Sequence, residues 1–309
     1  MGTDAEATYG AAQFVTGSGP GAFELGGALR AFGHFDQPNP FAGYLTTILP
    51  LAVCMALCRA NPVGFRWLAF GAAGLLAMGI GLSQSRGAWL GALVASVCLL
   101  LAWSAATRRL LVPCAVGATL ALALALTGLL PAAILDRWAQ TVEYFGVFDV
   151  RTVQLTPENW AVVERMAHWQ AGWYMFVDHP WLGVGAGNYA AAYPDYFVGN
   201  WREALGHAHN YYLNILAELG VLGGGMLAVL LGLSFVRIGG PLVRSEGTPA
   251  GFWRALLAGA FGGLVVFCVH NLFDSLFVHS VNVQIGVLLG LGLVAADRVR
   301  RSTLSLVLA

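Results

Sequence analysis

The chain has 309 residues, of which 58% are apolar and only 10% are charged, and its mean hydropathy is +0.68. Soluble domains carry about 25% charged residues, so this composition excludes an ordinary soluble protein and indicates an integral membrane protein. The formal net charge is zero, which argues against a nucleic-acid-binding protein.

The first 39 residues are rich in glycine and polar residues and carry acidic side chains at Asp4, Glu6 and Glu24. No basic segment precedes an apolar core here, so the pattern does not predict a signal peptide. We expect residues 1–39 to form an extracytoplasmic N-terminal segment in front of a membrane domain that covers residues 40–309.

Seven stretches are apolar and long enough to cross a membrane, at about 20 residues for each span. Six connections are short, whereas residues 131–209 form one long loop. The pattern predicts an all-α, polytopic membrane helix bundle of about seven spans with one long, partly helical extracytoplasmic loop. The predicted spans are 41–58, 67–83, 87–106, 110–130, 211–236, 253–272 and 279–296.

The arginines predict the orientation. All 16 basic residues are arginine, and ten of them fall on one side of the predicted bundle together with only two acidic residues, Glu246 and Asp297. An excess of basic residues marks the cytoplasmic side, so the N-terminus, the long loop and all seven histidines are expected at the outer face. Since an outer N-terminus without a leader is unusual, we also expect one or more spans to precede this chain.

Within the long loop, Thr156-Pro157-Glu158 has the features of a helix start, with an N-cap threonine, a first-turn proline and an acid. The helix should end near Asp178-His179-Pro180, because the residue before proline avoids the helical region. Residues at alternating spacings of four and three predict its apolar face: Val162, Met166, Trp169, Trp173 and Phe176.

Three glycines follow this helix, in Gly183-Val184-Gly185-Ala186-Gly187. No strand precedes them and no βαβ unit surrounds them, so a dinucleotide-binding loop is not supported. Two interpretations stay open, a tight turn with close backbone approach and a nest of backbone amides that faces an anion.

Several polar side chains fall at the predicted outer boundary. Arg86 lies between two spans with almost no loop, so it either extends to the interface or binds a carboxylate or phosphate. The same argument applies to Arg165, although Glu164 and Glu158 could pair with it in a surface salt bridge. Asp274 lies on the last outer loop, where it could orient a base, bind a sugar hydroxyl or cap a helix.

Two histidines, His207 and His209, precede the span 211–236. Two residues apart, they would point to different sides of a helix, and the i, i+4 spacing of many metal sites is missing. We therefore predict no metal site and no cofactor, and assign a histidine here as a general base, since its pKa lies near neutrality. Glu218 lies nine residues beyond His209, about 13 Å along a helix, and is expected to serve packing or orientation.

The spacing His209-Asn210, nine residues, Gly220, two residues, Gly223 fits a signature of O-antigen ligases. Other features resemble the wider superfamily of membrane ligases and polymerases that contains them. These features are Gln37-Pro38-Asn39 at a span start, Ser85-Arg86-Gly87 at an outer helix end, and Asp178-His179-Pro180-Trp181-Leu182-Gly183 in the long loop. The resemblance covers roughly residues 32–296.

This resemblance implies metal-independent glycosyl transfer at the outer face of a bacterial inner membrane. The donor would be a glycan linked to undecaprenyl pyrophosphate in the lipid bilayer, and the acceptor a glycan, lipid A-core or a protein. His209 aligns with the family's catalytic base, and Arg86 and Arg165 with arginines that bind the leaving pyrophosphate. We further predict that five residues contribute to substrate binding: His207, Asn210, Tyr211, His168 and Asp274.

The signature does not separate a ligase from a polysaccharide polymerase or a protein O-oligosaccharyltransferase. Two further interpretations belong to other classes, a transporter of lipid-linked glycans and an inactive, truncated membrane protein. A transporter would be expected to carry charged residues along a path through the membrane. Apart from Glu218, the interiors of the predicted spans carry no clear charge.

Overall fold

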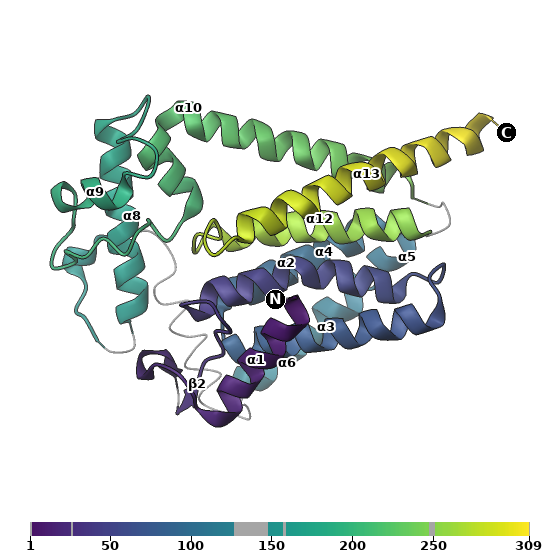
Figure 1. Cartoon of the computed structure of the whole chain (residues 1–309), viewed down its shortest axis with the longest axis horizontal. Coiled ribbons are helices and arrows are strands. Elements are labelled where there is room, and N and C mark those ends of the chain that lie inside the picture. The colour runs from purple at the N-terminus through teal and green to yellow at the C-terminus, as the bar shows by residue number, and fades with distance from the viewer. Residues whose placement is uncertain (1, 26, 127–147, 157–158, 247–250, 309) are drawn as a thin grey trace. The chain divides into compact units, whose positions relative to one another are not determined.

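The computed structural model describes residues 2–25, 27–126, 148–156, 159–246 and 251–308 (Figure 1). Nearly all of the regular structure in these residues is helical. The strands of this part of the chain are β1 (Glu24–Leu25) and β2 (Ala28–Leu29), which pair antiparallel. The prediction of an all-α, polytopic helical membrane protein is confirmed.

Six helices of the described residues are long and apolar enough to cross a membrane. They coincide with six of the seven predicted spans. The remaining prediction, 110–130, corresponds to α6 (Leu111–Leu126), and its last residues lie outside the described part. The six are α2 (Pro38–Leu57), α3 (Val63–Ser83), α4 (Arg86–Trp103), Tyr211–Arg244 with α10 (Tyr211–Ser234) and α11 (Gly240–Arg244), α12 (Phe252–His270) and α13 (Val281–Leu308).

The chain forms two compact units, which are described separately below. The first contains residues 1–111, 230–271 and 276–309, and the second contains residues 112–229 and 272–275. Four residues of the connection between α12 and α13 therefore belong to the second unit. Both units include parts of the long helix α10, because the division falls within it.

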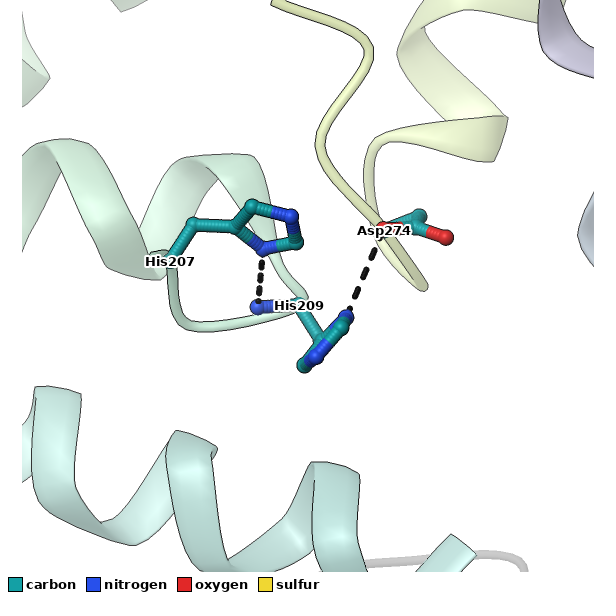
Figure 2. Close-up of side chains that lie close together, drawn as sticks. All are labelled: His207, His209 and Asp274. Carbon is teal, nitrogen blue, oxygen red and sulfur yellow. Dashed lines mark hydrogen bonds and ion pairs between the residues drawn. The ribbon is translucent and has the colours of Figure 1, made fainter. Parts of the chain in front are cut away.

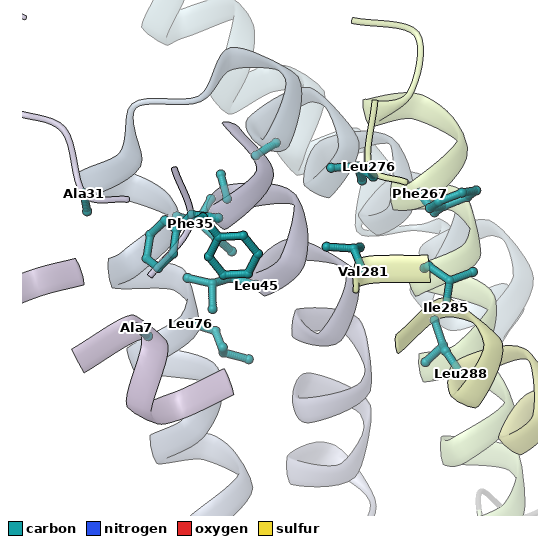
Figure 3. Packing of buried hydrophobic residues seen from close by; sticks show 14 of the residues in the cluster. Ala7, Ala31, Phe35, Leu45, Leu76, Phe267, Leu276, Val281, Ile285 and Leu288 are labelled. Atoms are coloured by element: carbon teal, nitrogen blue, oxygen red, sulfur yellow. The ribbon is translucent and has the colours of Figure 1, made fainter. Parts of the chain in front are cut away.

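The core of the first unit forms around α12, which lies against α2 through small residues. A Cβ atom on Gly263 would lie 2.5 Å from the Thr47 carbonyl oxygen, and one on Gly262 would lie 2.6 Å from Pro50 Cβ. Glycines at such positions let membrane helices approach closely. Figure 3 shows the neighbouring apolar cluster, in which Leu45, Leu76 and Leu288 are buried.

The N-terminal residues belong to this first unit, where α1 (Thr3–Thr16) packs on α3. The buried carboxylate of Glu6 accepts a hydrogen bond from the His34 backbone N–H at 3.1 Å. The Gln13 side chain donates to the Gly33 carbonyl and accepts from the Gly33 N–H, both at 2.8 Å. These contacts hold α1 against residues 33–34, and the packing of α1 on α3 was not predicted by the polar composition of this segment.

In the second unit, α8 (Trp160–Asp178) is the helix predicted within the long loop. It ends at Asp178 as predicted and begins at Trp160, and its N-cap residue Asn159 makes no side-chain cap hydrogen bond. Just before the helix, Thr156 and Asn159 exchange side-chain and backbone hydrogen bonds at 3.3 and 2.9 Å. Pro157 and Glu158 lie outside the described residues. Of the predicted apolar face, Met166 is buried and Trp173 is 51% exposed, and the other three residues are half-buried. The buried face instead comprises Val163, Met166, Ala167, His168, Ala171 and Met175.

The glycine-rich loop after α8 packs on a break in α10. The break is at Gly220, whose φ of 62° and ψ of −161° are not helical. The Val221 N–H donates to the Pro180 carbonyl at 2.7 Å, and the Val184 N–H donates to the Ala217 carbonyl at 2.9 Å. A Cβ atom on Gly220 would lie 2.4 Å from the Trp181 carbonyl carbon, so this signature glycine is required by close backbone approach.

The amides of this loop do face an anion, and the anion is Glu218. Its carboxylate accepts hydrogen bonds from the Gly187 N–H at 3.0 Å and the Tyr189 N–H at 3.2 Å. Both interpretations of the three glycines therefore apply together, since the turn is tight and its nest holds an internal carboxylate. The expectation that Glu218 serves orientation is met by this contact.

Candidate active site

The residues before α10 form a short loop that presents His209. The His209 backbone is left-handed, with a φ of 52°, a conformation that costs energy for residues other than glycine and often occurs at functional sites. Two contacts hold it there: the Trp169 indole N–H donates to the His209 carbonyl at 3.2 Å, and the Ala208 N–H donates to the Asn214 side chain at 3.0 Å.

Figure 2 shows the His209 ring directed at Asp274, with Nδ1 at 3.5 Å from the carboxylate Oδ1. His209 is 7% exposed and Asp274 is 3% exposed. The distance is longer than a well-formed hydrogen bond of about 2.9 Å but is short enough for an ion pair. Since Nδ1 faces the carboxylate, a neutral ring carries its proton on Nδ1 and keeps Nε2 as the basic nitrogen.

Asp274 is buried, yet the structure favours its ionised form. Burial alone would raise the pKa of Asp274, but the contact with His209 and the positive charge of Arg165 outweigh it and hold that pKa well below its usual range. Asp274 does not cap a helix, because α12 ends at His270 and α13 begins at Val281. The interpretation of Asp274 as a group that orients a base fits this geometry best.

Arg165 belongs to the same group of side chains. Its charge also acts on His207, and its Nε is buried without a hydrogen-bond partner among the described residues. Within the part of the chain that the structure describes, no acidic side chain forms an ion pair with Arg165. The salt-bridge alternative is therefore not realised with Glu164, and Glu158, the other predicted partner, lies outside the described residues.

The other two histidines of this group are held neutral. Burial lowers the pKa of His207 to about 4, and its Nδ1 accepts a hydrogen bond from the His209 backbone N–H at 3.0 Å (Figure 2). Burial lowers the pKa of His168 to about 3. The His168 ring stacks on Tyr193 with 4.8 Å between centroids and contacts His209 edge-on at 5.5 Å. Both histidines thus support the position of His209.

The remaining two predicted binding residues lie at the start of α10. The Asn210 side-chain oxygen accepts a hydrogen bond from the Leu213 N–H at 3.1 Å, as an N-cap does. The Tyr211 backbone N–H donates to the Asp274 carbonyl at 3.2 Å and thereby fixes the acid next to the base. In the signature, Asn210 thus has a local structural role.

Arg86 is described in the first unit, where it is the first residue of α4 and is half-buried. His209, Asp274, Arg165, His207 and His168 all belong to the second unit. The structure thus brings together most of the predicted site residues within one unit and describes Arg86 separately.

His207, His209 and Asp274 also offer three possible metal ligands, with ligand atoms within 4.8 Å of one another. Helical i, i+4 spacing does not apply to this group, because the two histidines lie in a loop and Asp274 is 65 residues beyond His209. Two features oppose a cation here: His207 Nδ1 already accepts a backbone hydrogen bond, and the positive charge of Arg165 lies close by.

From the sequence, Glu164 was expected only as a salt-bridge partner of Arg165, and no role was predicted for Tyr189 or Tyr193. Tyr189 donates its hydroxyl to the His168 carbonyl at 2.9 Å, so the loop held by Glu218 also supports His168. Burial raises the pKa of Tyr193 to about 12, which keeps its hydroxyl protonated. The tyrosines after the glycine turn are visible in the sequence, but the contact of Tyr189 with His168, 21 residues earlier, is not.

Residues 71–228, slightly more than half of the chain, match the profile of the family described as O-antigen ligase. The chain belongs to the O-antigen ligase family. The predicted resemblance is confirmed, and the protein is a multi-pass membrane protein of the glycosyltransferase and ligase superfamily. The match includes Arg86, Arg165, His168 and the His209 signature up to Gly223, whereas Asp274 lies beyond it. A comparison with curated proteins found no match.

Proposed function

We propose that this O-antigen ligase family member transfers a glycan from an undecaprenyl-pyrophosphate carrier to an acceptor hydroxyl at the outer face of a bacterial inner membrane. The observation that carries the proposal is the buried pair of His209 and Asp274, with the positive charge of Arg165 beside it. An imidazole oriented by a carboxylate is suited to remove a proton from a hydroxyl.

In the proposed reaction, His209 Nε2 takes the proton of the acceptor hydroxyl while its oxygen forms a bond to the anomeric carbon of the donor. The bond from that carbon to the pyrophosphate oxygen breaks, and its electron pair leaves with the pyrophosphate, so the anomeric centre inverts. Negative charge builds up on the leaving group, and guanidinium groups stabilise such charge. We assign this role to Arg165 and, by the family resemblance, to Arg86.

Asp274 is proposed to keep Nδ1 protonated and to stabilise the imidazolium that forms when Nε2 accepts the proton. His207 and His168 hold the ring in place through the contacts described above. We assign acceptor or donor sugar binding to His207 and Tyr211, which are only half-buried. Whether the acceptor is lipid A-core, a growing glycan or a protein separates a ligase from a polymerase or an oligosaccharyltransferase.

The experiment is transfer in vitro, with purified protein in lipid nanodiscs, a lipid-pyrophosphate glycan and separate candidate acceptors. Formation of a covalent glycan–acceptor product supports the proposal, and movement of the glycan lipid across a vesicle without such a product supports a transporter instead. Arg165→Ala and Arg86→Ala should each lower the rate about 100-fold or more, as loss of a group that stabilises transition-state charge does.

A metal-assisted transfer is the second candidate, because His207, His209 and Asp274 could ligate a divalent cation. The two mechanisms differ in their response to a chelator. Transfer that persists after dialysis against EDTA supports His209 as a free base, and transfer that is lost on dialysis and restored by one divalent metal supports the cation.

A further inference from the structure

One face of α8 connects an exposed tryptophan to the buried base. Trp160, Glu164 and His168 follow one another at spacings of four residues, so their side chains lie along one row of the helix. Along this row the burial increases, since Trp160 is 50% exposed, Glu164 is half-buried and His168 is 1% exposed and touches His209. The eight residues span about 12 Å, which is longer than a single sugar ring.

At the exposed end of this row, Trp160 packs edge-on against Trp201, with 4.6 Å between ring centroids. Hydrogen bonds hold the Trp160 side chain and the Trp201 backbone in place. The Trp160 indole hydrogen-bonds to the Glu164 carboxylate, and the Trp201 carbonyl accepts a hydrogen bond from the Tyr193 hydroxyl at 2.9 Å. The two indoles thus form a fixed aromatic surface that is partly open to solvent.

Glu164 lies between this aromatic surface and the base, and the proposed reaction assigns it no role. It is half-buried and forms no ion pair with any described arginine. Burial raises the pKa of Glu164, and the nearby charges of His209 and Arg165 offset only part of this effect. A half-buried carboxylate needs polar partners to offset its lost hydration, and a ligand rich in hydroxyl groups would supply them.

We propose that Trp160, Trp201 and Glu164 form a sugar-binding subsite for the glycan residues next to the one that reacts. The inference rests on the proposed function, since it takes the ligand to be the transferred or accepting glycan. The apolar C–H face of a sugar ring packs on an indole, and sugar hydroxyls donate hydrogen bonds to a carboxylate. In this subsite, Trp160 and Trp201 would stack on the sugar ring. Glu164 would accept hydrogen bonds from the sugar hydroxyls near His209.

The test measures binding rather than transfer. The probe is the free oligosaccharide released by mild acid from the lipid-linked glycan, titrated into protein in nanodiscs by calorimetry. Trp160→Ala and Glu164→Gln should each raise Kd about tenfold, a size typical of residues that dominate an interface. The matched control is Trp173→Ala, which removes a tryptophan of the same exposure from the same helix, 13 residues away on another face, and should leave Kd within about twofold.

Trp160→Phe keeps an aromatic ring and should lose less affinity than Trp160→Ala. This comparison distinguishes loss of stacking from loss of the folded state. The proposed subsite is wrong if Trp160→Ala and Glu164→Gln both bind the oligosaccharide with the wild-type Kd. It is also wrong if Trp173→Ala loses as much affinity as they do. The proposed function has its own readout, since His209→Gly should bind the oligosaccharide normally and fail to transfer it. If transfer requires His209 but the Kd is unchanged in Trp160→Ala and Glu164→Gln, the subsite is refuted and the proposed function is not.

Discussion

Replacing Gly220 with alanine should release the glycine-rich loop from α10. The φ of 62° and ψ of −161° at Gly220 lie in a region that is nearly restricted to glycine, where another residue costs about 1–3 kcal/mol. The added Cβ would also lie 2.4 Å from the Trp181 carbonyl carbon and 2.6 Å from the Leu182 nitrogen. Overpacking of this kind costs about 1–3 kcal/mol, so local docking should weaken by roughly 2–6 kcal/mol.

Hydrogen exchange measures this local opening directly. The amides of Val184, Gly185 and Val221 donate hydrogen bonds across the docked loop, and each should exchange about 30-fold faster or more, since 1.4 kcal/mol corresponds to a factor of ten. Gly225→Ala is the matched control, because it lies in the same helix with nothing within 4 Å of the added Cβ. It should leave these amides unchanged.

Transfer should also slow in Gly220→Ala, because the docked loop carries Tyr189, whose hydroxyl holds the His168 backbone beside His209. Equal exchange rates in Gly220→Ala and Gly225→Ala would refute the reasoning, since they would mean that the close approach of the loop to Gly220 does not exist.

Three further predictions concern the site itself. Asp274→Asn should lower the transfer rate by about 10²–10⁴-fold while the protein stays folded, because the amide no longer fixes the His209 tautomer; a rate within threefold of wild type would contradict the pairing. The second unit should lose stability as pH falls from 6.5 through about 4, because the pKa of His207 is lowered from 6.5 to about 4 and the unfolded chain binds that proton first. The thermal unfolding midpoint of His207→Gln should fall less steeply with pH over this range, and an unchanged slope would argue against a neutral, half-buried His207 in the folded state. EDTA should leave the transfer rate unchanged if His209 acts as a free base, and a loss that added metal reverses would establish the metal-assisted alternative.

The positions of the membrane spans were the part of the fold most accessible from the sequence, because length and apolarity define a span locally. Residues 38–57, 86–103 and 252–270 form helices close to their predicted positions for this reason. The break at Gly220 could not be seen in this way, since residues 211–236 have the length and apolarity of one span and the cause of the break is the backbone of residues 180–182.

The site shows the same division between local and long-range information. His209, Arg165 and His207 were predicted from their chemistry and from a short signature. The close approach of Asp274 to His209 depends on a loop 65 residues further along the chain, so the sequence left three roles open for it. The face of α8 was predicted from the spacing of its larger apolar residues, which did not indicate that the small side chains Ala167 and Ala171 are buried in the second unit.

The central claim is that His209 Nε2 acts as the general base, and chemical rescue tests it most directly. His209→Gly suits this experiment, because glycine accepts the φ of 52° at this position and the deleted ring leaves room for free imidazole. Without imidazole the variant should transfer glycan about 10²–10⁴-fold more slowly than wild type, and added imidazole should restore part of the rate in proportion to its neutral form. Transfer by His209→Gly at a rate within a few-fold of wild type, with no response to imidazole, would contradict the account.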